Sequence, residues 1–386
     1  MPTTLTHDTS GSFTRARPSG APGRRDHEDH RDLWDNPMGT FGFEFIEYTA
    51  EDTAALGRLF EIMGFRPVAR HRSKAVTHYR QNDINFIVNA EPRSFAQSFA
   101  RVHGPSVCAI AFRVRDAAQA FERACALGAE PYHGRVGPME LNIPAIRGIG
   151  ESLIYLVDRA DNPSIYDVDF VPVDPAQDTD REDPGVGLRE IDHLTHNVFR
   201  GRMDLWAEFY ERLFNFRQIR YFDIEGKLTG LRSRAMTSPC GRIRIPINES
   251  ADDKSQIAEY LYAYRGEGIQ HIALSTDDIY ATVEALKARG LDFMDPPPAA
   301  YYEAVDRRLP GHGEDLERLR RNGILIDGAP TQGGGILLQI FTRTVIGPIF
   351  FEIIQRKGDE GFGEGNFKAL FESMEQDQIR RGVLEG

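Results

Sequence analysis

The same order of apolar and polar positions recurs four times along the chain. Each copy has an apolar run of strand length, a polar turn, and then a stretch with apolar residues three or four apart, as in a helix. In the third copy Leu205, Phe209 and Leu213 follow one another at intervals of four. Short strand-like runs follow each helix, so the predicted unit is one strand, one helix and several further strands. The four copies begin at Phe43, Val107, Ile191 and Ile269.

Two pairs of these units predict two homologous domains. We expect an α+β protein in which each domain pairs two βαβββ modules into a curved mixed sheet with helices outside. A polar leader without hydrophobic period and an acidic stretch rich in Pro and Gly mark the remaining segments as a disordered leader and a linker. The predicted boundaries are a leader at 1–37, an N-terminal domain at 38–173, a linker at 174–187, a C-terminal domain at 188–360 and a C-terminal helix in 361–386.

Composition narrows the class of partner. The formal net charge of -12 argues against nucleic acid or an anionic membrane surface as a partner. No apolar run approaches the roughly 20 residues of a membrane helix. The three scattered cysteines, Cys108, Cys125 and Cys240, favour a reducing, cytoplasmic compartment. We expect small-molecule partners and a homo-oligomer.

Two histidines fall at equivalent positions of the repeat. Aligning the third and fourth copies places IDHL over IQHI, so His193 and His271 coincide, whereas His196 has no counterpart and strand alternation turns it away from His193. Equivalent positions of two modules paired about a pseudo-twofold axis can meet at the centre of a domain, where two imidazoles can bind a metal. Phe45 and Ala109 stand at these positions in the first domain.

A third candidate ligand is Glu352, in the apolar strand GPIFFEIIQR. An unpaired carboxylate there would lose several kcal/mol to desolvation, so it needs a partner. Tyr155 is its counterpart in the first domain. Coincidental polar core residues are the structural alternative. Two imidazoles and one carboxylate form the facial triad of non-haem ferrous iron sites, although zinc hydrolysis also fits this ligand type.

Several motifs resemble those of the 4-hydroxyphenylpyruvate dioxygenases of the vicinal oxygen chelate superfamily. The resemblance covers nearly all of the chain from Met38 onward and rests on motifs that occur in the expected order: IDHLTHNV at 191, LRS at 231, PINES at 246, KSQIAEY at 254, GIQHIAL, LLQIFT at 337, FFEIIQR and GFGEGNFKALF at 361. The resemblance implies an Fe(II) site at His193, His271 and Glu352, and no catalytic residue beyond this metal site.

The resemblance also implies a substrate pocket. Its polar members would be Ser233, Asn248, Gln256, Gln270 and Gln339, and its aromatic members Phe341, Phe350, Phe362 and Phe367. The last two would close over the substrate ring from the C-terminal segment. Plain core packing is the alternative for each phenylalanine.

The implied reaction converts 4-hydroxyphenylpyruvate and O2 into homogentisate and CO2 in tyrosine catabolism. Three alternatives remain open. 4-Hydroxymandelate synthase resembles this family and oxidises the benzylic carbon of the same substrate. An extradiol catechol dioxygenase would need a further pocket histidine, for which His196 is the nearby candidate but points away. A binding protein of the same fold would not need an intact ligand trio.

Overall fold

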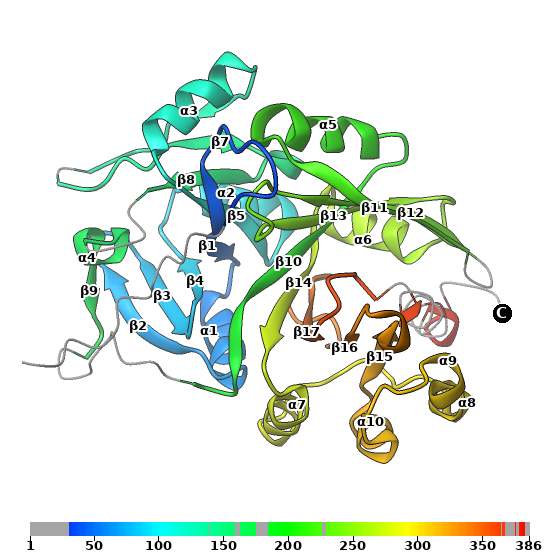
Figure 1. Cartoon of the computed structure of the whole chain (residues 1–386). Helices are drawn as coiled ribbons and strands as arrows, with labels where there is room; N and C mark the ends of the chain where they lie inside the picture. The colour runs from blue at the N-terminus through cyan, green and yellow to red at the C-terminus, as the bar shows by residue number, and fades with distance from the viewer. Residues whose placement is uncertain are drawn as a thin grey trace, which may run out of the picture. The chain divides into compact units, whose positions relative to one another are not determined.

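Four βαβββ units follow one another along the chain, as the sequence repeat predicts (Figure 1). The computed structural model describes residues 31–137, 139–158, 163–174, 184–225, 229–363, 365–366, 375 and 378–382. All elements named below belong to the compact unit Asp32–Gly386. The first two units form a nine-stranded sheet and the last two an eight-stranded sheet. The α+β class and the paired βαβββ modules predicted from the sequence are therefore confirmed.

The elements have the following bounds. The first sheet contains β1 (Thr40–Thr49), β2 (Arg66–His71), β3 (Val76–Gln81), β4 (Ile84–Asn89), β5 (Ser106–Val114), β6 (Pro131–Tyr132), β7 (Ala145–Arg147), β8 (Leu153–Val157) and β9 (Phe170–Pro172). The second contains β10 (Leu188–Val198), β11 (Arg217–Glu225), β12 (Gly230–Thr237), β13 (Arg244–Ser250), β14 (Gly268–Thr276), β15 (Leu325–Gly328), β16 (Ile336–Phe341) and β17 (Phe350–Lys357). The helices are α1 (Thr53–Ile62), α2 (Phe95–His103), α3 (Ala117–Ala126), α4 (Ile165–Asp169), α5 (Met203–Phe214), α6 (Gln256–Tyr264), α7 (Ile279–Ala288), α8 (Ala299–Glu303), α9 (Val305–Arg308) and α10 (Leu316–Asn322).

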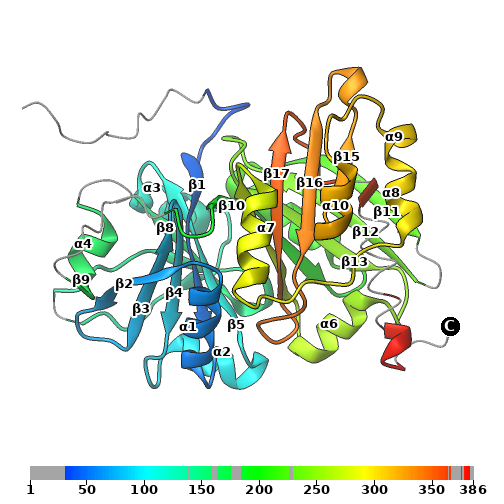
Figure 2. The same cartoon turned by 90° about the horizontal axis from the view of Figure 1, so that it is seen from below.

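The two sheets have the same strand order. In the N-terminal half (residues 40–172) the order is β2-β3-β4-β1-β5-β8-β7-β6, with β9 added beside β2. In the C-terminal half (residues 188–357) it is β11-β12-β13-β10-β14-β17-β16-β15. Figure 2 shows the two sheets side by side. At the centre of each sheet, the first strands of its two units pair antiparallel, β1 with β5 and β10 with β14.

One face of the eight-stranded sheet belongs to a large apolar core. Leu194, Ile247 and Ile272 lie in a buried cluster that also contains residues of α5, α6, α7 and the N-terminal half. Phe86 and Phe351 join the two halves within it, with ring centroids 6.1 Å apart. Burial of this face fixes the strand register, because a slip of one residue would turn the core residues outward. The opposite face is left to carry polar side chains.

Two β-bulges decide which side chains reach that opposite face, which we call the inner face. Between Ile191 and His193 the pairing with β14 passes over Asp192. On β14 it passes over Gln270, beside His271. A bulge inserts one residue and re-aims the side chains around it. Each histidine therefore has an additional polar residue next to it.

Some predicted segments fall outside the described residues. These are residues 1–30 of the leader, 175–183 of the linker and most of the C-terminal segment. Within the described part of the C-terminal segment, residues 365–366, 375 and 378–380 are helical. The domain boundaries therefore stay predictions. Helices α8 to α10 occupy the stretch between α7 and β15. Among the described residues, no helix is both long and apolar enough to cross a membrane.

Candidate metal centre

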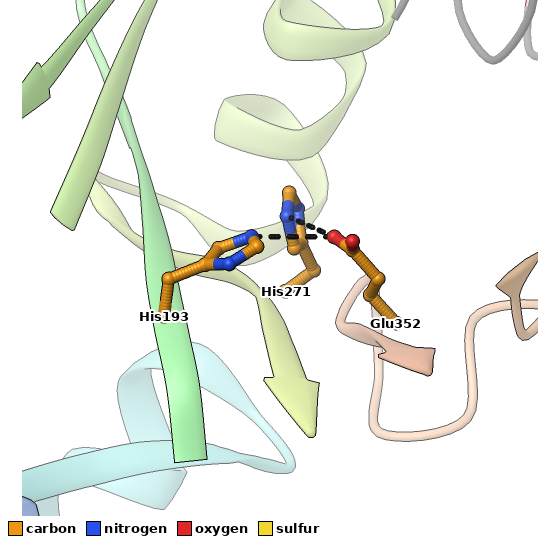
Figure 3. Close-up of side chains that lie close together, drawn as sticks. All are labelled: His193, His271 and Glu352. Carbon is orange, nitrogen blue, oxygen red and sulfur yellow. Dashed lines mark ion pairs between the residues drawn. The ribbon is translucent and has the colours of Figure 1, made fainter. Parts of the chain in front are cut away.

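Three neighbouring strands bring His193, His271 and Glu352 together (Figure 3). Across β10, β14 and β17, His193 lies opposite Ala273, which lies opposite Glu352, and His271 lies opposite Thr195. Directly opposed residues share one face of a sheet, so all three candidate ligands point from the inner face. Glu352 Oε2 is 3.2 Å from His193 Nε2 and 3.5 Å from His271 Nε2.

This spacing suits a single metal ion. The three side chains are buried and their ligand atoms all lie within 4.8 Å of one another. Protein ligands about 2.0–2.2 Å from one cation lie roughly 3.0–3.4 Å apart when they subtend angles near 90–110°. Two imidazoles and one carboxylate are a ligand set suited to ferrous iron that leaves further positions open. Zinc remains compatible with the same set.

Each candidate ligand is held from behind by a further polar group. Asp192 Oδ1 lies 2.9 Å from His193 Nδ1, and Gln270 Oε1 lies 3.1 Å from His271 Nδ1. Gln339 Nε2 donates to Glu352 Oε1 at 2.8 Å. Thr195 Oγ1 is 2.9 Å from His271 Nε2, the nitrogen that faces Glu352. Such partners fix ring orientation and tautomer in metal sites.

The local charges favour a cation at the trio. Burial raises the pKa of Glu352, but His193 and His271 outweigh it and lower this pKa below its usual value. Burial lowers the pKa of His193, but Glu352 and Asp192 outweigh it and raise this pKa. Burial dominates at His271 and lowers its pKa. The carboxylate is therefore ionised, and His271 is neutral and available as a ligand.

A row of buried polar side chains crosses the inner face beside the trio. Asn197 on β10 lies opposite Asn248 on β13, which lies opposite Ser233 on β12. We call these three residues the polar row. Within the described part of the chain, Asn197 Nδ2 and Oδ1, Asn248 Oδ1 and Ser233 Oγ have no hydrogen-bond partner. Such groups cost about 1–3 kcal/mol each when buried unsatisfied, so the row is suited to a polar ligand.

Three of the predicted pocket phenylalanines lie around the histidines. Phe350 stacks on His271 with ring centroids 4.9 Å apart, and Phe341 packs against Phe350 at 6.2 Å. The Phe362 ring centroid lies 5.4 Å from that of His193. Phe367 lies outside the described residues.

Gln256, at the start of α6, accepts from Gln270 Nε2 at 2.9 Å. A cavity of about 980 Å³ is lined by Gln256, Gln270, Phe350 and Met294, among others, but not by the trio. Gln270 and Phe350 both contact His271, so they form the wall between this cavity and the candidate ligands.

His196 faces the opposite side of β10, as strand alternation predicts. Its Nε2 lies 2.8 Å from the Tyr210 hydroxyl on α5, and both side chains are buried in the apolar core. His196 is therefore a core residue and has no access to the trio.

The chain matches known proteins over most of its length. Residues 34–171 match the family model described as "Hydroxyphenylpyruvate dioxygenase, HPPD, N-terminal", and residues 190–307 match the "Glyoxalase/Bleomycin resistance protein/Dioxygenase superfamily". The 4-hydroxyphenylpyruvate dioxygenase of Pseudomonas aeruginosa is 62% identical over 352 residues, which are 90% of this chain and 97% of that protein. The chain belongs to the 4-hydroxyphenylpyruvate dioxygenase family. The resemblance seen in the sequence motifs is thereby confirmed, and the chain is a dioxygenase of this family.

Other relatives of the family carry different names. Hemolysin VllY of Vibrio vulnificus is 67% identical over 353 residues, covering 90% of this chain and 98% of that protein. A solved structure of a mutant 4-hydroxymandelate synthase from Streptomyces coelicolor matches with a TM-score of 0.76 and 28% identity, covering 88% of this chain and 100% of that one. Membership of the family therefore leaves the product open.

Sequence reasoning missed four residues of this centre: Asp192, Thr195, Asn197 and Arg356. Asp192 directly precedes the candidate ligand His193. A search for groups that hydrogen-bond to the ligating histidines could therefore have found it. Thr195 and Asn197 follow His193 at steps of two, so strand alternation places them on the ligand's face. Arg356 follows Glu352 by four residues on β17 and shares its face in the same way.

Proposed function

We propose that this chain converts 4-hydroxyphenylpyruvate and O2 into homogentisate and CO2, with Fe(II) held by His193, His271 and Glu352. The observation that carries the proposal is the buried trio, whose ligand atoms lie within 4.8 Å of one another. Membership of the family supports the substrate. The α-keto acid of that substrate supplies the reducing electrons, so the reaction needs no separate reductant.

Bound ferrous iron would supply the dioxygen chemistry that two histidines and one carboxylate support. The side chains of the chain bind and orient the substrate. Phe350 and Phe341 beside His271, and Phe362 beside His193, provide apolar surfaces for an aromatic ring and exclude water from the ligands.

The polar row would receive the phenol hydroxyl of the substrate. A phenol can both donate and accept a hydrogen bond. The row offers amide N–H donors, amide oxygen acceptors and a hydroxyl that can do either. Pairing would remove the desolvation penalty of at least one buried group in the row, which adds to substrate affinity. Gln270 and Gln256 add a further polar pair at the lining of the cavity.

A second candidate product is 4-hydroxymandelate, which the structural match to 4-hydroxymandelate synthase supports. The test measures oxygen consumption by the Fe(II)-reconstituted protein in the presence of 4-hydroxyphenylpyruvate. The product is identified by chromatography and mass spectrometry. Homogentisate is the expected product. Formation of 4-hydroxymandelate would keep the metal centre and overturn homogentisate as the product, and absence of turnover would overturn the proposed activity.

We also infer a role in tyrosine catabolism, because homogentisate formation is a step of that pathway in the family this chain resembles. A cytoplasmic location is supported by its three cysteines, all of which are free thiols. The expected homo-oligomer remains a prediction that sedimentation would test.

A further inference from the structure

The carboxylate of Asp192 lies behind the candidate ligand His193. Its Oδ1 is 2.9 Å from His193 Nδ1. A group that accepts from one ring nitrogen fixes the tautomer, and leaves the other nitrogen free to bind a metal. That other nitrogen, Nε2, is the one that faces Glu352. The bulge of β10 at Asp192 makes this contact possible, because it turns the side chain of Asp192 toward that of the adjacent His193.

Two arginines compensate the buried charge of Asp192. Arg356 donates from Nε to Oδ2 at 2.7 Å and from Nη2 to Oδ1 at 2.8 Å, and Arg244 Nη1 is 3.3 Å from Oδ2. Two parallel bonds from one guanidinium hold a carboxylate in a fixed orientation.

The same two arginines hold the segment that follows β17. Arg356 Nη1 donates to the carbonyl oxygens of Asp359 and Gly361, at 3.0 and 2.6 Å. Arg244 Nη2 donates to Glu360 Oε2 at 2.5 Å. The segment ends at Phe362, whose ring packs against the ring of His193. The arginines therefore connect the carboxylate behind His193 with the segment that covers this ligand.

We propose that Asp192 and Arg356 form a positioning pair, which orients the ring of His193 for metal binding and couples that orientation to the placement of residues 359–362. The proposal rests on the metal centre proposed above and adds residues that do not touch the metal. Coupling of this kind is reciprocal: if an ordered segment strengthens metal binding, then metal binding must order the segment to the same degree.

The N-terminal half contains a matched control. Glu44 occupies the bulge of β1 between Phe43 and Phe45, as Asp192 occupies the bulge of β10 between Ile191 and His193. Glu44 is also buried and pairs with an arginine, since its Oε2 is 2.6 Å from Arg113 Nε. Glu44→Gln therefore removes a comparable buried charge pair at the equivalent position, away from the proposed metal centre.

The first experiment measures Fe(II) binding to the metal-free full chain under anaerobic conditions. Asp192→Asn and Arg356→Gln should each weaken Fe(II) binding about 10–100-fold, the range typical of lost outer partners of ligating histidines. Arg356→Lys keeps the charge but loses the two-pronged contact, so it should fall between Arg356→Gln and the unchanged protein. Glu44→Gln should bind Fe(II) with unchanged affinity.

The second experiment measures hydrogen exchange of the peptide spanning residues 356–366, with and without Fe(II). In the unchanged protein Fe(II) should slow this exchange. In Arg356→Gln the slowing should disappear at saturating Fe(II), because the link between ligand and segment is gone. A peptide of α3 serves as an internal reference whose exchange Fe(II) should not alter.

The outcomes separate this proposal from the metal centre on which it rests. If the unchanged protein fails to bind Fe(II), or if Glu352→Ala binds it fully, the metal centre itself is wrong. If the unchanged protein binds Fe(II) and folded Asp192→Asn and Arg356→Gln bind it equally well, the positioning pair alone is wrong. Should Asp192→Asn fail to fold, the two Arg356 variants decide, and unchanged affinity in both overturns the proposal.

Discussion

The two halves of the molecule share their strand pairing and differ in the side chains placed on it. In the N-terminal half Phe45 lies opposite Ala111, which lies opposite Tyr155, and Ala109 lies opposite Glu47. These are the pairings that His193, Glu352 and His271 make in the C-terminal half. Where one half gathers three candidate ligands, the other packs two aromatic rings with centroids 5.7 Å apart. The same backbone thus carries either a cluster of candidate metal ligands or a packed pair of aromatic rings.

The polar row shows the same contrast. Its counterparts by register in the N-terminal half are Thr49, Asn89 and Val76. Thr49 Oγ1 donates to the carbonyl oxygen of Asn89, Asn89 Nδ2 donates to Glu47 Oε1, and Val76 is apolar. The N-terminal half pairs these groups internally, whereas the C-terminal half leaves Asn197, Asn248 and Ser233 with unpaired polar atoms. At this row, among the described residues, only the C-terminal half therefore keeps buried polar atoms with which a ligand could pair.

Removing the carboxylate of Glu352 should leave the C-terminal half, like the N-terminal half, unable to retain iron. We expect Glu352→Ala to lose Fe(II) to background after gel filtration, because two neutral imidazoles retain no anionic partner for the cation. Metal analysis of the eluted protein measures this, and circular dichroism checks the fold. Tyr155→Phe, at the equivalent position of the other half, should keep its iron. Full occupancy in Glu352→Ala would contradict the assignment.

Acid should weaken both halves through one buried histidine in each. Burial lowers the pKa of His78 and of His196 to about 3. At pH 7 both histidines are neutral in the folded and in the unfolded chain, so their burial does not lower the free energy of unfolding through protonation. Below their unfolded pKa of about 6.5 only the unfolded chain takes up the proton, so stability falls until the pH reaches about 3.

The expected loss approaches about 1.4 kcal/mol per pH unit for each histidine between roughly pH 6 and 4. Urea unfolding across this range measures it. His78→Gln and His196→Gln should each flatten the pH dependence by a similar amount. Equal slopes in the variants and the unchanged protein would show that these histidines become charged in the folded state.

Replacing Ser233 by the residue found at its counterpart should make the two rows more alike. Ser233→Val removes a buried hydroxyl without a partner among the described residues, so it should stabilise the metal-free protein by about 1 kcal/mol. Loss of one hydrogen bond to the substrate should raise KM about 5–10-fold. Thermal unfolding and steady-state kinetics measure the two effects, and an unchanged KM would remove Ser233 from the pocket.

The smallest expected effect is one in which the halves behave alike. Asp116 caps α3 by accepting from Gln119 N, and Asp278 caps α7 by accepting from Ala281 N. Asp116→Ala and Asp278→Ala should each cost about 1 kcal/mol of stability and leave Fe(II) affinity unchanged. A weaker Fe(II) affinity in Asp278→Ala alone would show that α7 helps to place the centre.

The sequence was sufficient to predict that the trio lies together, because residues aligned by the repeat occupy equivalent positions in the paired strands. Equivalence of His193 with Phe45 and of Glu352 with Tyr155 follows from the repeat and agrees with the observed pairing. The position of His196 follows from alternation alone. The metal-ligand and pocket roles of these residues remain predictions.

Other parts of the centre depend on contacts that a sequence pattern does not contain. Asp192 and Gln270 reach the ligands because of bulges, and a bulge is decided by the pairing of two strands. Arg356 donates to carbonyl oxygens of a loop that has no hydrophobic period. The contact of Phe362 with His193 likewise depends on how that loop folds back over the sheet.

The paired bulges also bear on the history of the chain. Both halves carry them at the same places, at Glu44 and Asp192 in one strand and at Cys108 and Gln270 in the other. Independent gain at matching positions would need a double coincidence, so inheritance from a single ancestral module pair is the simpler account. The bulges beside both histidine positions then existed before the duplication. Divergence of the two copies at this centre required only point substitutions, with no insertion or deletion in the central strands.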